Sequence, residues 1–239
     1  MPERRTSILS VRGLRRTFGE LTAVDDLDLD LASGECVALI GHNGSGKTTA
    51  LRVIGGRLEP TAGTVSMNGA DVHDRRSGHI ARARLAFVPD TPVLYEDLTV
   101  REHLELVGVA HDASDGLDER IDVLLERLGL VARSDFLPPH LSRGMRQKTQ
   151  IGCAFARPFD VLLLDEPVVG LDPPSQATLR ALLLEAKRDG AGVVFSTHQL
   201  DFSAGLADRL FVLDDGRVVD QGPFDAVRAG PEATRLGLI

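Results

Sequence analysis

The order of apolar and polar residues predicts strands and helices that alternate along much of the chain. Over residues 24–31, apolar side chains nearly alternate with four aspartates, a pattern typical of a half-exposed strand. Residues 36–40 form a continuous apolar run, which favours a parallel strand buried on both faces. A helix is expected over 48–54. A strand over 64–67 should then end in a hairpin turn at Asn68-Gly69, which indicates an antiparallel flap beside a parallel sheet.

The hydrophobic period changes from residue 99 onward. Apolar residues recur at helical spacing, at Val100, Leu104 and Val107 and again at Leu117, Ile121, Leu124, Leu125 and Leu128. A polar break interrupts this pattern at 112–116, but no linker is long enough to separate two independent domains. We therefore predict a single domain over residues 1–239, with a helical subdomain inserted at about 91–157 and a C-terminal tail at 223–239.

Three further strand-like runs follow, at residues 161–164, 193–196 and 210–213, with helical stretches between them. This alternation predicts an α/β fold with a mainly parallel sheet at its core. In such folds, ligand-binding groups gather at the carboxyl ends of the strands. The residues that follow each predicted strand are therefore the first candidates for chemistry.

A glycine-rich segment follows the strand predicted at 36–40 and fits G-x-x-x-x-G-K-[ST], the phosphate-binding loop of P-loop NTPases. In such a loop, backbone N–H groups and a helix N-terminus surround phosphate oxygens. Lys47 is expected to reach the β- and γ-phosphates, and Thr48 to ligate Mg²⁺. Lysine occurs at only three positions of the chain, so a chance match is rare. The expected nucleotide-binding residues are Gly41, His42, Asn43, Gly44, Ser45, Gly46, Lys47, Thr48 and Thr49.

Two acidic residues, Asp165 and Glu166, follow the apolar strand predicted at 161–164. Asp165 can hold Mg²⁺ through water, and Glu166 can polarise a water molecule for in-line attack on the γ-phosphate. A strand that ends in Asp-Glu-Pro could also simply be followed by a solvated turn. The upstream phosphate loop favours the catalytic interpretation.

Composition and charge narrow the class of protein further. The chain has 26% charged residues and a net charge of -8, which argues against nonspecific binding to nucleic acid or anionic lipid. Cys36 and Cys153 are far apart and lack C-x-x-C spacing, which favours two small core residues over a zinc site or a disulfide. No apolar segment follows the charged residues 1–5, and no run approaches the roughly 18 apolar residues that span a bilayer. We expect a cytoplasmic protein.

The order and spacing of further motifs resemble those of the ATP-binding cassette (ABC) ATPases, over about residues 8–222. Leu141-Ser142-Arg143-Gly144-Met145 stands where that family has its L-S-G-G-Q motif, and Gly170-Leu171-Asp172 stands at its D-loop. His198 falls at the family's switch histidine, and Phe18 at an aromatic position that stacks on adenine.

The resemblance implies how two copies of the chain would share the nucleotide. In the family, two subunits sandwich two ATP molecules. Ser142, Gly144 and Asp172 would contact the ATP bound by the opposite subunit, whereas Lys47, Glu166 and His198 would be catalytic residues on the nucleotide's own side.

Other interpretations of these residues stay open. Ser142 could serve only as the N-cap of a helix, although capping and phosphate binding need the same exposed helix N-terminus. A lone histidine such as His198 is more often a structural residue, and Phe18 could belong to the core.

The sequence departs from the family pattern at two places. Asp90 stands where the family usually has a glutamine that touches Mg²⁺ and water. An ionised carboxylate ligates Mg²⁺ but cannot donate a hydrogen bond, so we expect Asp90 to bind the metal with Thr48 and Asp165 while sensing phosphate differently. Arg143 and Met145 alter the L-S-G-G-Q motif in a way that resembles subunits of exporter-type permeases, although Arg143 could also lie on a solvated helix face.

The resemblance implies an ATPase subunit that uses ATP and Mg²⁺, forms a homodimer and powers a separate integral membrane permease, for export. It would lie in the cytoplasm, peripheral on the inner face of the cell membrane through the permease. Residues 91–95 resemble the groove that receives a permease coupling helix. The alternative is a soluble ABC ATPase of an assembly machine such as iron-sulfur cluster biogenesis. A nucleic-acid partner is not expected, because such relatives resemble two cassettes in one chain or carry long coiled-coil insertions.

Overall fold

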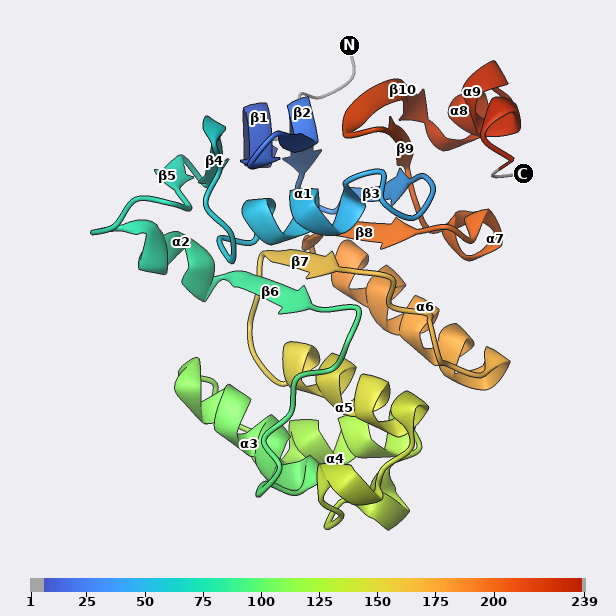
Figure 1. The fold of residues 1–239 in the computed structure, drawn as a ribbon. Coiled ribbons are helices and arrows are strands. Elements are labelled where there is room, and N and C mark those ends of the chain that lie inside the picture. The colour runs from blue at the N-terminus through green and yellow to red at the C-terminus, as the bar shows by residue number, and fades with distance from the viewer. Residues whose placement is uncertain (1–6, 238–239) are drawn as a thin grey trace.

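A six-stranded sheet forms the centre of the computed structural model, which describes residues 7–237 (Figure 1). The strand order is β10-β9-β3-β8-β7-β6, and all neighbours are parallel except the edge pair β10 and β9. The predicted strands at 36–40, 161–164, 193–196 and 210–213 are confirmed to within about one residue at each end. The six strands are β3 (Cys36–Ile40), β6 (Leu85–Val88), β7 (Val161–Leu164), β8 (Gly192–Thr197), β9 (Arg209–Asp214) and β10 (Arg217–Pro223).

An antiparallel sheet of order β2-β1-β4-β5 forms the predicted flap. Its strands are β1 (Ser7–Phe18), β2 (Leu21–Ala32), β4 (Ala62–Met67) and β5 (Ala70–Asp71). The periodicity argument did not find β1. The pairing of β1 with β2 shifts between Val11 and Leu14, around Gly13 with its φ of 52°. Such a bulge interrupts the alternation of apolar and polar residues that marks a strand.

The side chains of β3 divide between two hydrophobic cores. Val37 and Leu39 belong to a core shared with the flap and α1 (Lys47–Ile54), whereas Ala38 and Ile40 belong to a core shared with the helices on the opposite face. Successive side chains of a strand point to opposite faces, so one continuous apolar run supplies both cores. This double burial holds the carboxyl end of β3 in place, and with it the loop that begins at Gly41.

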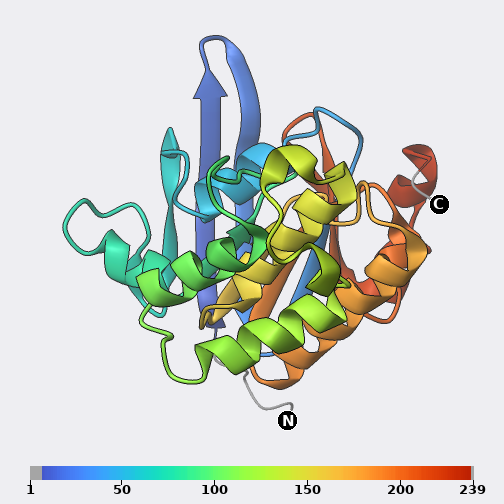
Figure 2. The ribbon, with the colours of Figure 1, turned by 90° about the horizontal axis from the view of Figure 1, so that it is seen from below.

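Helices cover both faces of the six-stranded sheet (Figures 1 and 2). α1 lies between this sheet and the flap, and α6 (Pro173–Arg188) packs on the other face. α3 (Val100–Ala110), α4 (Leu117–Arg127) and α5 (Arg143–Phe155) form a separate block within residues 91–157. The shorter helices are α2 (Gly78–Ala83), η1 (Val131–Arg133), η2 (Pro138–His140), α7 (Leu200–Ser203), α8 (Phe224–Arg228) and α9 (Pro231–Arg235).

Two expectations about the chain as a whole can be compared with the structure. Cys36 and Cys153 are free, buried thiols, as predicted, and burial raises the pKa of Cys153 to about 12. Within residues 7–237, no helix combines the length and the apolar character needed to cross a bilayer. The charged residues 1–5, on which the expectation about a leader segment rested, lie outside the described residues.

Candidate active site

The phosphate loop connects the end of β3 to the start of α1, and its glycines are required by close backbone packing. Gly46 caps α1 with a φ of 101°, and a Cβ at this position would lie 2.3 Å from the Ala23 carbonyl oxygen. A Cβ on Gly41 would lie 2.3 Å from the Leu213 carbonyl oxygen. No side chain fits at either place without moving a neighbouring strand. The sequence therefore folds this segment into a tight backbone loop at a helix N-terminus, the usual geometry of a phosphate site.

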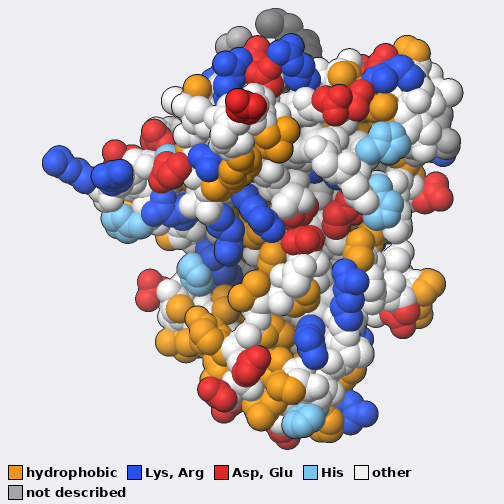
Figure 3. Space-filling view, in the orientation of Figure 1, with side chains coloured by type: hydrophobic (Ala, Val, Ile, Leu, Met, Phe, Trp, Pro, Cys, Tyr) orange, Lys and Arg blue, Asp and Glu red, His pale blue; other side chains and the backbone are white. Residues whose placement is uncertain are grey.

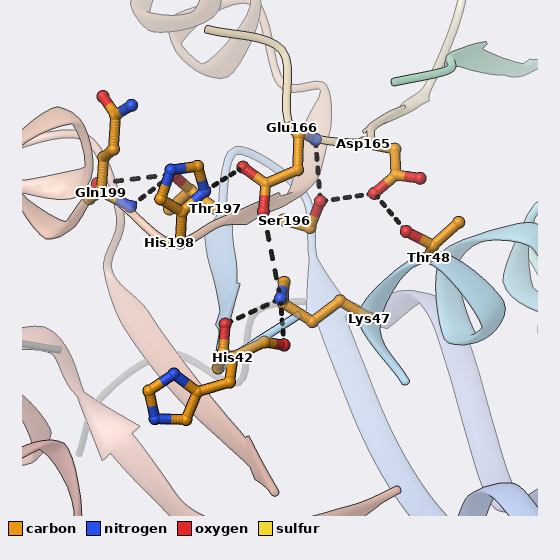
Figure 4. A network of polar contacts seen from close by, with 10 residues as sticks. His42, Lys47, Thr48, Asp165, Glu166, Ser196, Thr197, His198 and Gln199 are labelled. Atoms are coloured by element: carbon orange, nitrogen blue, oxygen red, sulfur yellow. Dashed lines mark hydrogen bonds and ion pairs between the residues drawn. The ribbon is translucent and has the colours of Figure 1, made fainter. Parts of the chain in front are cut away.

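Lys47 points into the loop that precedes it (Figure 4). Its Nζ donates to the carbonyl oxygens of Gly41 at 2.7 Å and His42 at 2.9 Å, and lies 3.9 Å from Glu166 Oε1. Burial lowers the pKa of Lys47, while the Glu166 and Asp165 carboxylates oppose that shift. A buried ammonium held by carbonyl oxygens can exchange these partners for phosphate oxygens, which carry more negative charge.

Asp165 is fully buried at the end of β7. Its Oδ1 accepts hydrogen bonds from the hydroxyls of Thr48 at 3.1 Å and Ser196 at 2.6 Å. Burial raises the pKa of Asp165, and these two hydrogen bonds partly offset the rise. The other oxygen, Oδ2, is buried without a hydrogen-bond partner among the described residues. An unpaired carboxylate oxygen beside a P-loop threonine is suited to a divalent cation or its water.

Glu166 is held in position by its backbone and by a histidine. Its φ is 45°, a left-handed conformation that costs a non-glycine residue about 1 kcal/mol. The Glu166 N–H donates to Ser196 Oγ at 2.8 Å, and its Oε2 lies 2.9 Å from Nδ1 of His198 (Figure 4). The structure thus brings Glu166, His198 and Lys47 together, as predicted.

Ser196 is a site residue that the sequence argument did not find. Its hydroxyl accepts the Glu166 N–H and donates to Asp165 Oδ1, so one side chain positions both acidic residues. The available signal was its place at the carboxyl end of β8, next to β7 in the sheet. Periodicity identified the strand but could not show that its last residues reach the acids of a neighbouring strand.

A pocket of about 390 Å³ opens beside the phosphate loop. Phe18 lies in its wall and is 44% exposed, so the alternative interpretation, in which Phe18 belongs to the core, is wrong. Leu21 and Ala23 also line this pocket, and the sequence argument did not find them. The predicted residues in its wall are Phe18, Asn43, Gly44, Gly46, Lys47, Thr48, Thr49, Asp90 and Glu166. A larger hollow of about 750 Å³ near α4 and α6 contains none of the motif residues, so size alone does not mark the site.

A second pocket, of about 480 Å³, contains the other predicted set, Ser142, Gly144 and Asp172. Ser142 caps α5 by accepting the Met145 N–H at 3.2 Å, and Asp172 caps α6 by accepting the Ser175 N–H at 3.2 Å. A Cβ on Gly144 would lie 2.7 Å from the Gly170 carbonyl oxygen. The L-S-G-G-Q-like helix and the D-loop-like turn therefore form one packed unit with an exposed helix N-terminus.

The phosphate loop, the buried acid beside Thr48 and the second acid beside Lys47 define a P-loop nucleoside triphosphatase. The comparisons with known proteins specify its family. The family model for the ABC transporter matches residues 24–169. The chain belongs to this family, as an ATP-binding subunit that hydrolyses ATP.

Individual relatives agree with this assignment. ABC-type transporter ATP-binding protein EcsA of Bacillus subtilis (strain 168) is 35% identical over 223 residues, which cover 93% of this chain and 90% of EcsA. Nod factor export ATP-binding protein I of Ralstonia nicotianae is 36% identical over 218 residues, which cover 91% of this chain and 67% of that protein. A solved ATP-binding subunit of an ABC transporter is 36% identical with a TM-score of 0.86, and the match covers 97% of this chain and 94% of that one.

Proposed function

We propose that this ATPase subunit works as a homodimer and drives export through a separate membrane permease. The supporting observation is that the two predicted halves of a nucleotide site lie in different pockets of one chain, around Lys47 and around Ser142. A two-fold dimer can place each half against its complement. Export is favoured by the similarity to a Nod factor export protein. It is also favoured by Arg143 and Met145, which alter the L-S-G-G-Q motif in a way that resembles subunits of exporter-type permeases. An assembly machine is not favoured, because the relatives are transporter subunits.

Magnesium is proposed to bind beside the phosphates, at Thr48, Asp165 and Asp90. Within residues 7–237, no group of three or more His, Cys, Asp and Glu side chains is placed to hold a metal by itself. A P-loop site does not need one, since the nucleotide supplies several of the oxygen ligands. The unpaired Oδ2 of Asp165 next to the Thr48 hydroxyl fits such a cation. When bound, Mg²⁺ would neutralise phosphate charge.

Hydrolysis is proposed to depend on three residues of the same pocket. Glu166 would orient and polarise the attacking water, and Lys47 would stabilise charge on the transferred phosphate. His198, bonded to Glu166, would hold that carboxylate in place. Ser142, Gly144 and Asp172 of the second subunit would complete the site, and Phe18 would stack on the adenine.

The permease is proposed to bind at residues 91–95, at the entry to the helical block. Val93 is 77% exposed and Tyr95 is 66% exposed, whereas Leu94 is half-buried. Exposed apolar side chains in one segment are characteristic of partner sites. This contact would hold the subunit at the inner face of the cell membrane.

The proposed domain organisation is one domain over residues 1–239, with a helical subdomain at about 91–157 and a C-terminal tail at 223–239.

Membrane fractionation of cells that express this chain tests the proposed partner. The protein should sediment with membranes and, after mild detergent, elute together with a multi-spanning membrane protein. Recovery only in soluble complexes would contradict a transport function and favour an assembly machine.

Replacing Asp165 with Asn should stabilise the nucleotide-free protein while removing Mg²⁺-dependent hydrolysis. Burial raises the pKa of Asp165 in the folded state, so its ionised form opposes folding above that pKa. The variant should melt about 2–4 °C higher at neutral pH, if the ionised group costs about 1 kcal/mol. This advantage should shrink as the pH falls through the raised pKa of Asp165. Thermal melts from pH 4 to 8 measure the difference in melting temperature between the variant and the unaltered protein. A variant that melts at a lower temperature than the unaltered protein at pH 7 would contradict a destabilising effect of the ionised Asp165 carboxylate.

Replacing Asp90 with Gln tests the unusual metal ligand. The Asp90 carboxylate lies 3.6 Å from the Arg52 guanidinium in the wall of the nucleotide pocket. A neutral amide ligates Mg²⁺ more weakly, so the Mg²⁺ concentration for half-maximal ATP hydrolysis should rise about fivefold. Asp97→Asn, a nearby exposed change, is the control. If the Mg²⁺ requirement and the partner-stimulated activity both match those of the unaltered protein, Asp90 is not a ligand.

A further inference from the structure

The hairpin of β1 and β2 exposes hydrophobic side chains beside the nucleotide pocket. Figure 2 shows that its turn projects beyond the other strands, and Figure 3 shows hydrophobic side chains at the surface over the flap and α1. Within residues 7–237, the large hydrophobic residues that the flap exposes are Phe18 and Leu21, at 44% and 67%. They pair directly across the short turn, so both side chains lie on one face of the hairpin. Both also line the nucleotide pocket.

An arginine of the same strand stacks on Phe18. The guanidinium carbon of Arg16 lies 4.4 Å from the centre of the Phe18 ring, which is the geometry of a cation–π contact. Phe18 is a wall residue of the nucleotide pocket, whereas Arg16 is not. The guanidinium therefore covers the side of the ring that faces away from the pocket, and the side in the pocket wall stays open to a ligand.

The segment that follows α1 holds Arg16 in this position. Nη1 of Arg16 donates to the Glu59 carbonyl oxygen at 3.0 Å. The Thr17 N–H donates to Thr61 Oγ1 at 3.0 Å, and the Thr61 N–H donates to the Arg15 carbonyl oxygen at 2.8 Å. Nε of Arg16 is buried and has no hydrogen-bond partner among the described residues. Attraction to the π electrons of the ring accounts for this exception to the pairing of buried donors.

A positive charge on one face of an aromatic ring changes what the other face binds. The guanidinium draws the π electrons of Phe18 toward itself, so the face in the pocket wall becomes less negative. An electron-rich purine then stacks on that face more strongly than on an isolated ring. Because the contact also restricts the rotation of the ring, less freedom is lost when a base binds.

We propose that Arg16 is a positioning residue that acts through Phe18 and gives the pocket a preference for purine nucleotides. Arg16 fixes the Phe18 ring and strengthens its stacking on the base. Leu21 offers apolar surface to the same base from across the turn. The inference rests on the proposed stacking of Phe18 on adenine, and it adds the residue that supports the stacking and the base selectivity that results.

A fluorescent reporter tests the stacking itself. The chain contains no tryptophan, so Phe18→Trp introduces a single indole at the position of the proposed contact. ATP should quench its emission, whereas inorganic tripolyphosphate should not, because only ATP has a base that can stack on the indole. Emission that ATP leaves unchanged would overturn the adenine contact, and the role of Arg16 with it.

Replacing Arg16 with Met tests the arginine in the protein with its native Phe18. Methionine keeps an unbranched apolar stem but removes the charge. Equilibrium binding of ATP, CTP and tripolyphosphate is measured without Mg²⁺, so that no nucleotide is hydrolysed. Arg16→Met should weaken ATP binding about fivefold and reduce the preference for ATP over CTP about threefold. Tripolyphosphate should bind as it does to the unaltered protein, because it does not reach the ring.

Two further variants serve as rescue and control. Arg16→Lys keeps a cation and should restore most of the preference for ATP over CTP. Arg12→Met removes an arginine of the same strand that pairs with Asp30 at 2.7 Å and does not line the pocket. It should leave the affinity for all three ligands unchanged.

The outcomes separate the role of Arg16 from the proposed function. Quenching of the indole by ATP, together with an unaltered preference for ATP over CTP in Arg16→Met, would keep the adenine contact and overturn the role of Arg16. Equal weakening of ATP, CTP and tripolyphosphate binding would also overturn it, because Arg16 would then only maintain the fold of the flap.

Discussion

Replacing Glu166 with Gln should leave ATP binding nearly unchanged and slow hydrolysis by at least about a hundredfold, since general-base catalysis contributes on that scale. The amide has the size of the carboxylate but cannot accept a proton from water at neutral pH. Because Lys47 and Thr48 are unaltered, the ATP that is not hydrolysed should keep two subunits together. Single-turnover hydrolysis measures the first effect, and the molar mass in solution with ATP and Mg²⁺ measures the second.

The control for this change is Glu119→Gln, which removes an exposed carboxylate on α4. It should hydrolyse ATP at the rate of the unaltered protein. Full-rate turnover by Glu166→Gln would remove Glu166 from the catalytic step. Slow turnover without dimer formation would keep the catalytic role and contradict the shared site.

Local sequence patterns predicted the parts of the site that are contiguous in the chain. The phosphate loop combines fixed residue types with a buried strand and a helix, so one segment of the sequence specifies it. Asp165 and Glu166 follow a strand whose apolar run ends at Leu164. Such features depend on neighbours in sequence, which motif and period reveal.

The parts that the sequence did not reveal depend on contacts between distant segments. Ser196 matters because β8 lies beside β7, and Leu21 lines the nucleotide pocket because the flap folds over the phosphate loop. The pairing of Arg52 with Asp90 joins the end of α1 to the segment after β6. No periodicity in one strand or helix contains this information, because the sheet order that creates these contacts is set by the whole fold.

The two interpretations of Ser142 can be separated by a change that preserves its cap. Ser142 accepts the Met145 N–H, and aspartate caps helices as well as serine does. Ser142→Asp should therefore melt within about 2 °C of the unaltered protein, because the cap energy is retained. The negative charge of the new aspartate should nevertheless repel the γ-phosphate of the ATP that the opposite subunit binds, and it should reduce hydrolysis about a hundredfold. Ser142→Thr, which keeps a hydroxyl, should retain most of the activity.

Mixing two inactive variants should restore hydrolysis if Ser142 acts on the nucleotide of its partner. Lys47→Ala damages the phosphate loop, and Ser142→Asp damages the opposite half of the site. Each homodimer then has two defective sites, but a mixed dimer has one site with both defects and one that is intact. With random pairing and independent sites, half of the dimers are mixed and half of their sites are intact, so activity should reach about a quarter of the unaltered level. A mixture no more active than its components would show that the phosphate loop and Ser142 do not meet across a dimer.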